Sequence, residues 1–456
     1  MKKIKTTPVW LLWASLTIFF FSSCKKNVTP VDEQQQLSSI PKNAEHGHLK
    51  QAKTYSSEVA IKWMDMQLEL LRTTLPAAGQ GSSRHMAYSG IALYESVVEG
   101  IPGFQSLAGQ LNGLPAMPSI APGVAYHWAA CGNAALAFMN RSFYPTASAA
   151  NKATVDSLEN ALNAVYQTEV NAETFQRSVD FGKAVAQLVF NWSKRDGFAD
   201  VNPLYVSPVG PGFWVPVPPT FGPAVVPYFG NNRLFVPGSL EGSEPPPPLA
   251  YSTDHSSAYY EEMKEVYDVS QTLTPDQAAI GLFWRDNPGF FGPGHFLSML
   301  RQILQQENPS LEIAAIAYAK VGISVADALI ASLKSKYQYT TERPITYIRS
   351  VLGYATWNSL FNTPAQPEYP SAHANSAGAF GEAISGMFAQ FQLTDHSYDY
   401  LGMAPHTYHS AQDLFSEMIN ARIYAGIHIR YSCEIGIEQG RKIAQNIYAK
   451  LKFKKE

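Results

Sequence analysis

The chain has 456 residues, of which 46% are hydrophobic and only 16% are charged, and its formal net charge is −3. This composition provides enough apolar side chains for a sizeable core, and the length allows one large domain or several ordinary ones. Because the net charge is slightly negative and no basic face is evident, the composition argues against a protein that binds nucleic acid.

The first 24 residues are typical of a secretory signal. Lysines near the start precede an apolar stretch from Val9 to Phe21, which ends at small serines followed by Cys24. This stretch is shorter than the ~20 residues that a membrane-spanning helix needs, so a retained anchor is the weaker alternative. The sequence Ser-Ser-Cys resembles a bacterial lipobox, which implies that Cys24 carries lipid. We therefore expect an exported lipoprotein that is periplasmic or attached to the outer membrane.

The rest of the chain divides into a polar tether and one folded domain. Residues 25–50 show no apolar periodicity, whereas residues 51–456 are predicted to be mostly helical, which gives an all-α fold. In one predicted helix, Thr274 and Gln277 have the spacing of a capping box. We expect the last predicted helix to be buried on most sides, since it is nearly uncharged. The clearest predicted helices are 56–74, 178–197, 273–286 and 310–337.

Residues 202–250 differ from the rest because they are dense in proline, which prevents both helix and central strand. One interpretation is a disordered linker between two domains. The segment is also rich in aromatic residues, which disordered linkers lack. We therefore favour an ordered, extended excursion that packs over the helices, so that the two helical halves form one body. Its aromatic residues include Phe213, Trp214, Tyr228, Phe229 and Phe235.

Two cysteines, Cys131 and Cys433, lie in the predicted domain. They could pair, or both could be buried free thiols, and the sequence does not decide between the two. The chain has no CxxC motif and no Cys/His spacing typical of a metal site.

Three short segments in residues 330–450 combine into a candidate oxyanion site. Each segment alone is better explained by solvated cations or by a structural histidine. Together they supply three positive charges, and arginine guanidinium groups match tetrahedral oxyanions in pairs while lysine acts as a point charge. The two histidines add a proton-transfer group and a ligand or nucleophile. The segments are Lys336 with Arg343-Pro344, Pro370-Ser371-Ala372-His373, and Arg422 with His428.

Local chemistry predicts how these segments fold. Ser371 is expected to begin a helix whose free N–H groups point at an anion, and Ala372 lets the backbone approach it. Small residues at 374–381 allow neighbouring helices to pack closely. A residue before proline avoids the helical region, so Arg343 should lie just past a helix end. Arg422 and His428 lie about 240° apart on a continuous helix, so we expect a break between them, at Gly426.

The three segments, in this order and spacing, resemble the signature of the superfamily of phosphatidic acid phosphatase type 2 and vanadium-dependent haloperoxidases. Residues 283–296, 363–373 and 415–431 are similar to segments of its bacterial haloperoxidase branch. The similarity extends over nearly all of the mature chain, including 84–100 and the Pro-rich segment. It implies a helical-bundle fold and a vanadate prosthetic group.

The resemblance also implies roles for the site residues. Hydrogen peroxide would oxidise a halide to hypohalous acid, which reacts with a small organic acceptor. His428 would be the axial ligand of vanadium, and His373 the acid–base group. Lys336 would in addition polarise the peroxide. The groups that would hold the vanadate oxygens are Lys336, Arg343, Ser371, the amide of Ala372, and Arg422.

The chain departs from the family pattern at four positions. Ala372 replaces a glycine and Ser432 replaces an aspartate that often follows the second histidine. Leu333 and Gln366 stand where some members have aromatic residues that shape the halide pocket. The resemblance therefore implies an enzyme for iodide or bromide more than for chloride. The oligomeric state is left open.

Two other functions are considered. The first is an acid phosphatase of the same superfamily, with His428 as nucleophile and His373 protonating the leaving group. The chain has Ser432 where the family often has an aspartate, and this argues against a phosphatase, because the aspartate carboxylate would orient a nucleophilic histidine. The second is a non-catalytic lipoprotein that binds anions. Retention of all three cations and both histidines argues against it.

One acidic residue outside the three segments is expected to reach the site. Asp286 matches the aspartate of the family's Trp-x-Asp-Gly-Pro-Gly segment, and Arg422 needs a carboxylate because it lies beside other cations. We predict an ion pair between Asp286 and Arg422. The competing interpretation is that Asp286 pairs with Arg285 or with solvent.

Overall fold

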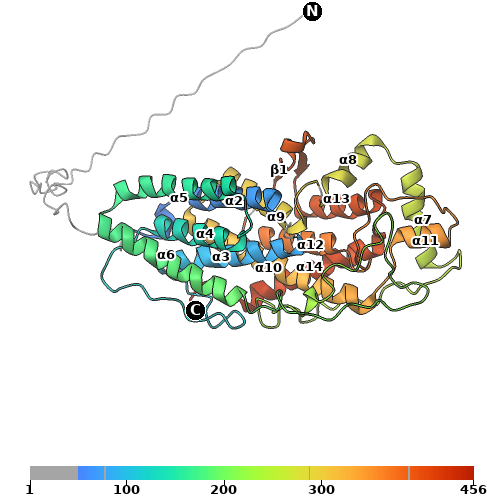
Figure 1. The fold of residues 1–456 in the computed structure, drawn as a ribbon, viewed down its shortest axis with the longest axis horizontal. Helices are drawn as coiled ribbons and strands as arrows, with labels where there is room; N and C mark the ends of the chain where they lie inside the picture. The colour runs from blue at the N-terminus through green and yellow to red at the C-terminus, as the bar shows by residue number, and fades with distance from the viewer. Residues whose placement is uncertain (1–49, 76–78, 287, 389–390, 456) are drawn as a thin grey trace, which may run out of the picture. The chain divides into compact units, whose positions relative to one another are not determined.

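The long uncharged segment near the middle of the chain forms the central helix, α10 (Leu311–Tyr339), in this computed structural model. The structure describes residues 50–75, 79–286, 288–388 and 391–455, which belong to one compact unit. Figure 1 shows α10 between a group of N-terminal helices (α2 to α6) and the helices α7, α8, α11 and α13. The expected signal peptide and nearly all of the expected tether lie outside the described residues.

The predicted all-α fold is confirmed. The only strands in the described residues are β1 and β2, which pair antiparallel with Leu393 opposite Tyr408. The helices and strands are η2 (Ala52–Thr54), α2 (Glu58–Thr73), η3 (Gly79–Gly81), α3 (Ser82–Val97), η4 (Val98–Gly100), α4 (Trp128–Phe143), α5 (Ala149–Glu169), α6 (Ala172–Ser193), η5 (Phe229–Asn231), α7 (Ala258–Gln271), α8 (Pro275–Phe283), α9 (Gly292–Glu307), α10, α11 (Pro344–Ser350), α12 (Ala372–Ser385), β1 (Leu393–Asp395), η6 (Asp399–Leu401), β2 (His406–Tyr408), α13 (Ala411–Tyr424) and α14 (Arg430–Lys450).

The predicted helices differ from the observed ones mainly at their ends. The capping box at the start of α8 is present, with reciprocal bonds between Thr274 and Gln277. Helix α6 begins at Ala172, before the predicted start at 178, because the Asn171 side chain accepts a hydrogen bond from the Thr174 N–H and caps an earlier turn. Asparagine is a strong cap residue, so this start was readable from the sequence.

The C-terminal helices α12 and α14 pack closely because glycines lie at their contact. A Cβ atom at Gly378 would lie 2.2 Å from the carbonyl oxygen of Ile437, and one at Gly440 would lie 1.9 Å from that of Asn375. Both distances are far below a normal van der Waals contact. The small residues after His373 therefore bring α14 against α12, and this packing fixes where α12 begins.

The Pro-rich segment is extended and packs along the helices. Its Trp214 N–H donates to the carbonyl oxygen of Thr340 at 2.7 Å, next to the end of α10. The Asp327 carboxylate on α10 accepts hydrogen bonds from the N–H groups of Phe235 and Val236 at 2.7 and 3.1 Å. Three of its aromatic side chains, Trp214, Phe229 and Phe235, are buried. These contacts attach the segment to α10 along much of its length.

Two further features of the sequence have a place in the fold. Cys131 and Cys433 are both free and buried.

Among the described residues, α10 is the one helix long and apolar enough to cross a membrane, and most of its surface is buried inside the protein. Its hydrophobicity is therefore accounted for by its position in the core.

Candidate active site

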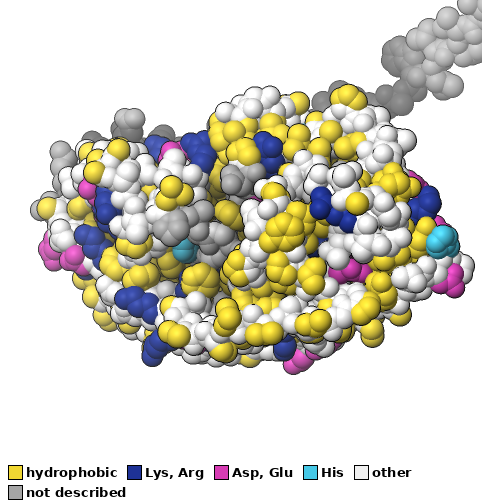
Figure 2. Space-filling view, turned by 45° about the vertical axis from the view of Figure 1, so that its right-hand side comes forward, with side chains coloured by type: hydrophobic (Ala, Val, Ile, Leu, Met, Phe, Trp, Pro, Cys, Tyr) yellow, Lys and Arg dark blue, Asp and Glu magenta, His cyan; other side chains and the backbone are white. Residues whose placement is uncertain are grey.

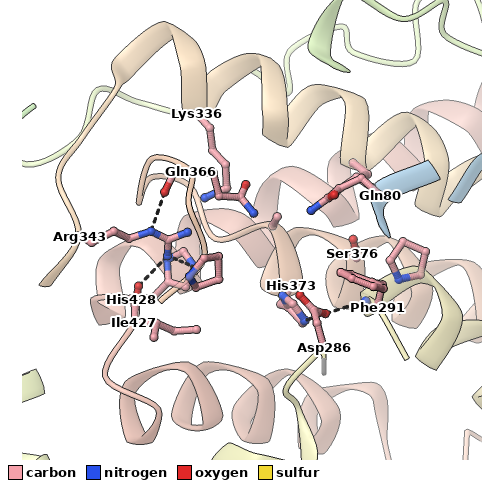
Figure 3. A pocket seen from close by; sticks show the side chains of 15 residues that line it. Gln80, Asp286, Phe291, Lys336, Arg343, Gln366, His373, Ser376, Ile427 and His428 are labelled. Carbon is pink, nitrogen blue, oxygen red and sulfur yellow. Dashed lines mark hydrogen bonds and ion pairs between the residues drawn. The ribbon is translucent and has the colours of Figure 1, made fainter. Parts of the chain in front are cut away.

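Five of the seven residues predicted from the three segments line one small cavity at the start of α12 and the end of α10, whereas Ser371 and Arg422 are not among its lining residues. The cavity has a volume of about 40 Å³, room for roughly three water molecules at ~10–15 Å³ each, or for one small oxyanion. Figure 3 shows Lys336, Arg343 and His428 on one side of it and His373 with Asp286 on the other. We call the seven predicted residues of the three segments the cage: Lys336, Arg343, Ser371, Ala372, His373, Arg422 and His428.

Lys336 approaches the cavity from the last turn of α10. Its side chain is buried, and Nζ donates hydrogen bonds to the carbonyl oxygens of Pro367 and Glu368 at 2.7 and 2.8 Å. Burial, together with the charge of Arg343, holds the pKa of Lys336 well below its ordinary value, although Glu368 opposes the shift. The ammonium group is therefore held at the cavity wall by backbone carbonyls.

Arg343 is the N-cap residue of α11 and has an extended backbone, as expected for a residue before proline. Its Nε donates to the carbonyl oxygen of Gln366 at 2.7 Å, and Nη1 donates to that of Ile427 at 2.8 Å. Burial lowers the pKa of Arg343 to about 10. The guanidinium thus remains charged at neutral pH, with its plane fixed by two segments of backbone.

Ser371 begins α12, as predicted. Its hydroxyl oxygen accepts a hydrogen bond from the Ala374 N–H at 3.5 Å, and its own N–H donates to the carbonyl oxygen of Ser432 at 3.2 Å. The first residues of the helix, Ala372 and His373, line the cavity. Because the first N–H groups of a helix have no acceptor within it, this end of α12 favours an anion.

Arg422 has buried donors that no described group satisfies. It is fully buried near the end of α13, and its Nη1 donates to the carbonyl oxygen of Trp284 at 2.7 Å. Among the described residues, Nε and Nη2 of Arg422 have no acceptor. A buried guanidinium with unpaired donors is costly, and an oxyanion beside it would supply the missing acceptors.

The predicted ion pair between Asp286 and Arg422 is wrong. In the described part of the chain, the Asp286 carboxylate pairs instead with His373, whose Nε2 lies 3.0 Å from Oδ1. Oδ1 also accepts a hydrogen bond from the Gly292 N–H at 3.0 Å. The segment does reach the cage from the middle of the chain, but Arg422 binds the backbone of Trp284, because the carboxylate is already held by His373 and Gly292.

The Asp286–His373 pair fixes the proton on His373. Burial lowers the pKa of His373 below its ordinary value, although Asp286 opposes the shift. Burial acts to raise the pKa of Asp286, but His373 and Arg422 outweigh it and hold that pKa below its ordinary value. His373 is therefore neutral at neutral pH and donates its Nε2–H to an ionised Asp286.

His428 follows the predicted helix break. Helix α13 ends at Tyr424, and Gly426 has a positive φ of 75°, a conformation that favours glycine. His428 Nε2 lies 3.0 Å from Nη1 of Arg343. Arginine can only donate, so Nε2 accepts and the proton of the neutral ring is on Nδ1. Burial, followed by the charges of Arg343 and Lys336, holds the pKa of His428 well below its ordinary value.

Glu368 is the functional residue that sequence reasoning missed. Its Oε1 accepts the Nδ1–H of His428 at 2.7 Å and the N–H of Ile429 at 3.2 Å, and the side chain is buried. Burial raises the pKa of this carboxyl to about 7, although Lys336 and Arg343 act to lower it. Glu368 thus supplies the orienting carboxylate that the sequence pattern lacks at Ser432.

A signal for Glu368 was present. A glutamate three residues before the helix-capping Ser371, in a stretch otherwise free of acidic and basic residues, is unusual for a buried segment. Sequence reasoning also missed Gln80, which lines the cavity from η3. A glutamine between two glycines far from the other site residues gives no comparable signal. Gln366 lines the cavity, whereas Leu333 packs in an apolar cluster behind it.

The charges in the site suit an anion more than a cation. Three buried cations outnumber the two nearby carboxylates, Asp286 and Glu368, and each carboxylate is occupied by a histidine. No group of three or more His, Cys, Asp and Glu side chains that could hold a metal ion occurs in the described ranges. The unpaired donors of Arg422 fit an oxyanion. Nε2 of His428 could serve as a nitrogen ligand to such a group, as vanadate can accept, in place of the hydrogen bond that it receives from Arg343.

Comparisons with known proteins agree with this geometry. Residues 317–454 match a protein family described as the VCPO second helical-bundle domain. Among solved structures, the chain is similar to one described as the first bacterial vanadium-dependent iodoperoxidase, with 28% identity and a TM-score of 0.79 over 88% of this chain and 98% of that chain.

Two more distant structures share the fold. A holo-type bacterial vanadium-dependent chloroperoxidase is 16% identical, with a TM-score of 0.63 over 84% of this chain and 93% of that one. The apo-type structure is 15% identical, with a TM-score of 0.60 over 81% and 94%. No curated protein matched the chain. The expected resemblance to the bacterial vanadium-dependent haloperoxidases is confirmed by the family match and by the iodoperoxidase.

Proposed function

We propose that this chain is a vanadate-dependent haloperoxidase, which uses hydrogen peroxide to oxidise iodide or bromide to hypohalous acid. The observation that carries the proposal is the neutral His428. Its Nε2 accepts a hydrogen bond from Arg343, and the charges of Lys336 and Arg422 also act on the ring; Arg422 has unpaired donors. The similarity to an iodoperoxidase over nearly the whole of that chain supports the same function.

The cage residues have distinct roles in holding the group. His428 would bind the metal through Nε2, while Glu368 fixes the proton on Nδ1. Lys336, Arg343 and Arg422 would neutralise the oxyanion. The hydroxyl of Ser371 and the amide of Ala372 would add hydrogen bonds. When bound, vanadate supplies a Lewis-acid centre that activates peroxide for oxygen transfer to a halide.

The remaining chemistry is proton transfer. Oxidation of a halide by hydrogen peroxide consumes one proton and yields hypohalous acid and water. His373 is the group at the cavity that can hold this proton, because its ring is neutral and its Nε2–H is anchored by Asp286. Lys336, held by the carbonyls of Pro367 and Glu368, places a positive charge next to the peroxide and favours its polarisation.

The preferred halide is iodide, with bromide second. Chloride is the hardest of the three halides to oxidise. Some family members have aromatic residues at two positions of the halide pocket, and this chain has Leu333 and Gln366 there. Leu333 packs behind the cavity and Gln366 lines it. The iodoperoxidase is also more similar to the chain than the chloroperoxidases are. We expect no chloride oxidation even at mildly acid pH.

An acid phosphatase remains the second candidate, and one observation favours it. Glu368 provides the carboxylate that a nucleophilic His428 needs, so the argument from Ser432 against a phosphatase does not hold. The same cage would then bind a phosphate monoester, with His373 protonating the leaving group. The non-catalytic alternative lacks a comparable observation.

A paired assay separates these functions. Purified protein is loaded with vanadate and given peroxide with iodide, bromide or chloride in turn. A parallel sample without vanadate is given a phosphate monoester. We expect iodide oxidation that needs vanadate and fades with excess phosphate, because both anions compete for the cage. Monoester hydrolysis without halide oxidation would establish the phosphatase instead.

We further propose that the enzyme is exported and anchored through lipid at Cys24. The proposal is supported by the basic start, the short apolar stretch and the lipobox-like Ser-Ser-Cys. Metabolic labelling with a radioactive fatty acid should label the wild-type chain and not the Cys24→Ala variant. Equal labelling of both, or of neither, would contradict a lipoprotein.

A further inference from the structure

A second cavity lies between the Pro-rich segment and the end of α6. Its volume is about 570 Å³, within the range of ~300–1,000 Å³ that is typical of small-molecule sites. No charged side chain is among the described residues that line it. We call this cavity the groove; its walls include Phe198, Leu204, Tyr205, Tyr228 and Phe229, with several prolines.

The groove and the cage share one apolar wall. Phe229 and Val226 line the groove, and Leu329 and Ala372 line the cage cavity. All four side chains belong to a single hydrophobic cluster, in which Phe229 and Leu329 are buried and Val226 and Ala372 pack against them. The two cavities are therefore separated by about one layer of side chains.

Two other contacts connect the groove to the site. Gln80 in η3 lines the cage cavity, and a Cβ atom on the next residue, Gly81, would lie 3.1 Å from the ring of Phe198 in the groove. The ring of Tyr205 meets that of Tyr337 edge-on, with centroids 5.0 Å apart, and Tyr337 directly follows Lys336. The groove thus borders the cage through three separate parts of the chain.

The surface at the groove is unusually apolar. Leu204 is 86% exposed although it forms part of the wall. No charged residue occurs between positions 201 and 232. Figure 2 shows hydrophobic areas between scattered charged side chains on the face that it presents. An uncharged cavity with aromatic and proline walls and a few hydroxyl and amide groups fits a small neutral aromatic molecule.

We propose that the groove binds a small neutral aromatic acceptor, such as a phenol, and holds it next to the cage as the target of the hypohalous acid formed there. This inference rests on the proposed haloperoxidase function. In the step, a carbon–halogen bond forms at the ring and the oxygen–halogen bond of hypohalous acid breaks. The ring carbon is oxidised and the halogen is reduced, while the ring proton and the released hydroxide form water.

A binding experiment tests the groove without any catalysis. Binding of phenol and of 4-hydroxybenzenesulfonate to vanadate-free protein is measured by ligand-observed NMR. Leu204→Asp places a carboxylate in the wall, and Val209→Asp is the matched control, because Val209 is 97% exposed on the same segment and does not line the groove. We expect phenol to bind, the sulfonate to bind at least about tenfold more weakly, and Leu204→Asp alone to weaken phenol by a similar factor.

Other outcomes overturn the inference. Absence of phenol binding, or equal weakening by both variants, would exclude a specific acceptor site. If the chain forms a dimer that both substitutions dissociate, the apolar surface is an interface with a second copy and not an acceptor site. Because these measurements need no vanadate, they hold even if the protein proves not to oxidise halides.

A labelling experiment tests delivery of the halogen. Vanadate-loaded protein is given peroxide and iodide without acceptor, and iodotyrosine is located by peptide mass spectrometry. Tyr205 and Tyr228 line the groove, whereas Tyr354 is 44% exposed and lies outside it. We expect the groove tyrosines to be iodinated faster than Tyr354, and phenol to suppress this. Labelling led by Tyr354 would show that hypoiodous acid escapes to solvent first.

Discussion

The substitution Glu368→Gln separates the roles of His428 as a ligand and of the cage as a general anion site. Glutamine keeps an acceptor for the Nδ1–H of His428 and for the N–H of Ile429, which lie 2.7 and 3.2 Å from Oε1. The fold should therefore tolerate the change. At a pH above the Glu368 pKa of about 7, only the negative charge behind the imidazole is lost.

The magnitude follows from the role of a carboxylate behind a ligating histidine, whose removal costs ~10–100-fold in metal affinity. Glutamine keeps the hydrogen bond and loses only the charge, so the Kd of vanadate should rise roughly tenfold, which is about 1.4 kcal/mol.

Phosphate supplies the internal comparison, because it would occupy the cage as an oxyanion without a metal bond to His428. Its Kd should change much less than that of vanadate in the Glu368→Gln variant. The two constants are measured by calorimetry and by competition. Glu342→Gln is the control, since Glu342 is a buried carboxyl next to Arg343 that bonds to the Tyr259 hydroxyl and not to His428. Equal changes for vanadate and phosphate would refute the assignment of Glu368.

Four further substitutions test the site and the fold. His428→Ala should abolish tight vanadate retention, whereas His373→Ala should keep vanadate and slow turnover ~10²–10⁴-fold; the reverse pattern would exchange their roles. Burial lowers the pKa of His85 to about 3, so on acidification the unfolded chain binds this proton before the folded chain does. The unfolding free energy should therefore fall as the pH drops below ~6.5, by about 2 kcal/mol at pH 5. His85→Phe should remove this part of the difference in unfolding free energy between pH 7 and pH 5, and an unchanged difference would contradict the prediction. Gly440→Ala should lower the unfolding free energy by about 1–3 kcal/mol or more in urea, because its Cβ would meet the carbonyl of Asn375; wild-type stability would show that the helices separate easily.

Much of the site could be predicted because its segments obey local rules. Arg343 precedes a proline, Ser371 is a good helix cap, and Gly426 provides the break that places His428 beyond α13. These are properties of a few consecutive residues. The close contact of α12 and α14 was also predictable, since a run of small residues permits it.

The errors concern pairings between distant segments. The sequence places Asp286 near the cage but does not tell whether its carboxylate meets His373 or Arg422, because that choice depends on shifts of a few ångströms in a loop. Glu368 was overlooked for a similar reason: it lies 60 residues before His428. Tertiary packing decides which carboxylate meets a histidine. The carboxylate that the motif lacks at Ser432 can therefore be supplied by another segment, here by Glu368.

The central claim is that one vanadate in the cage makes this chain a haloperoxidase. The most direct measurement titrates vanadate into the purified protein and follows, in the same samples, bound vanadium per chain and peroxide-dependent iodide oxidation. We predict that activity rises in proportion to bound vanadium, saturates at one per chain, and is reversed by excess phosphate. Iodide oxidation that does not depend on vanadium, or full binding without any halide oxidation, would contradict the account.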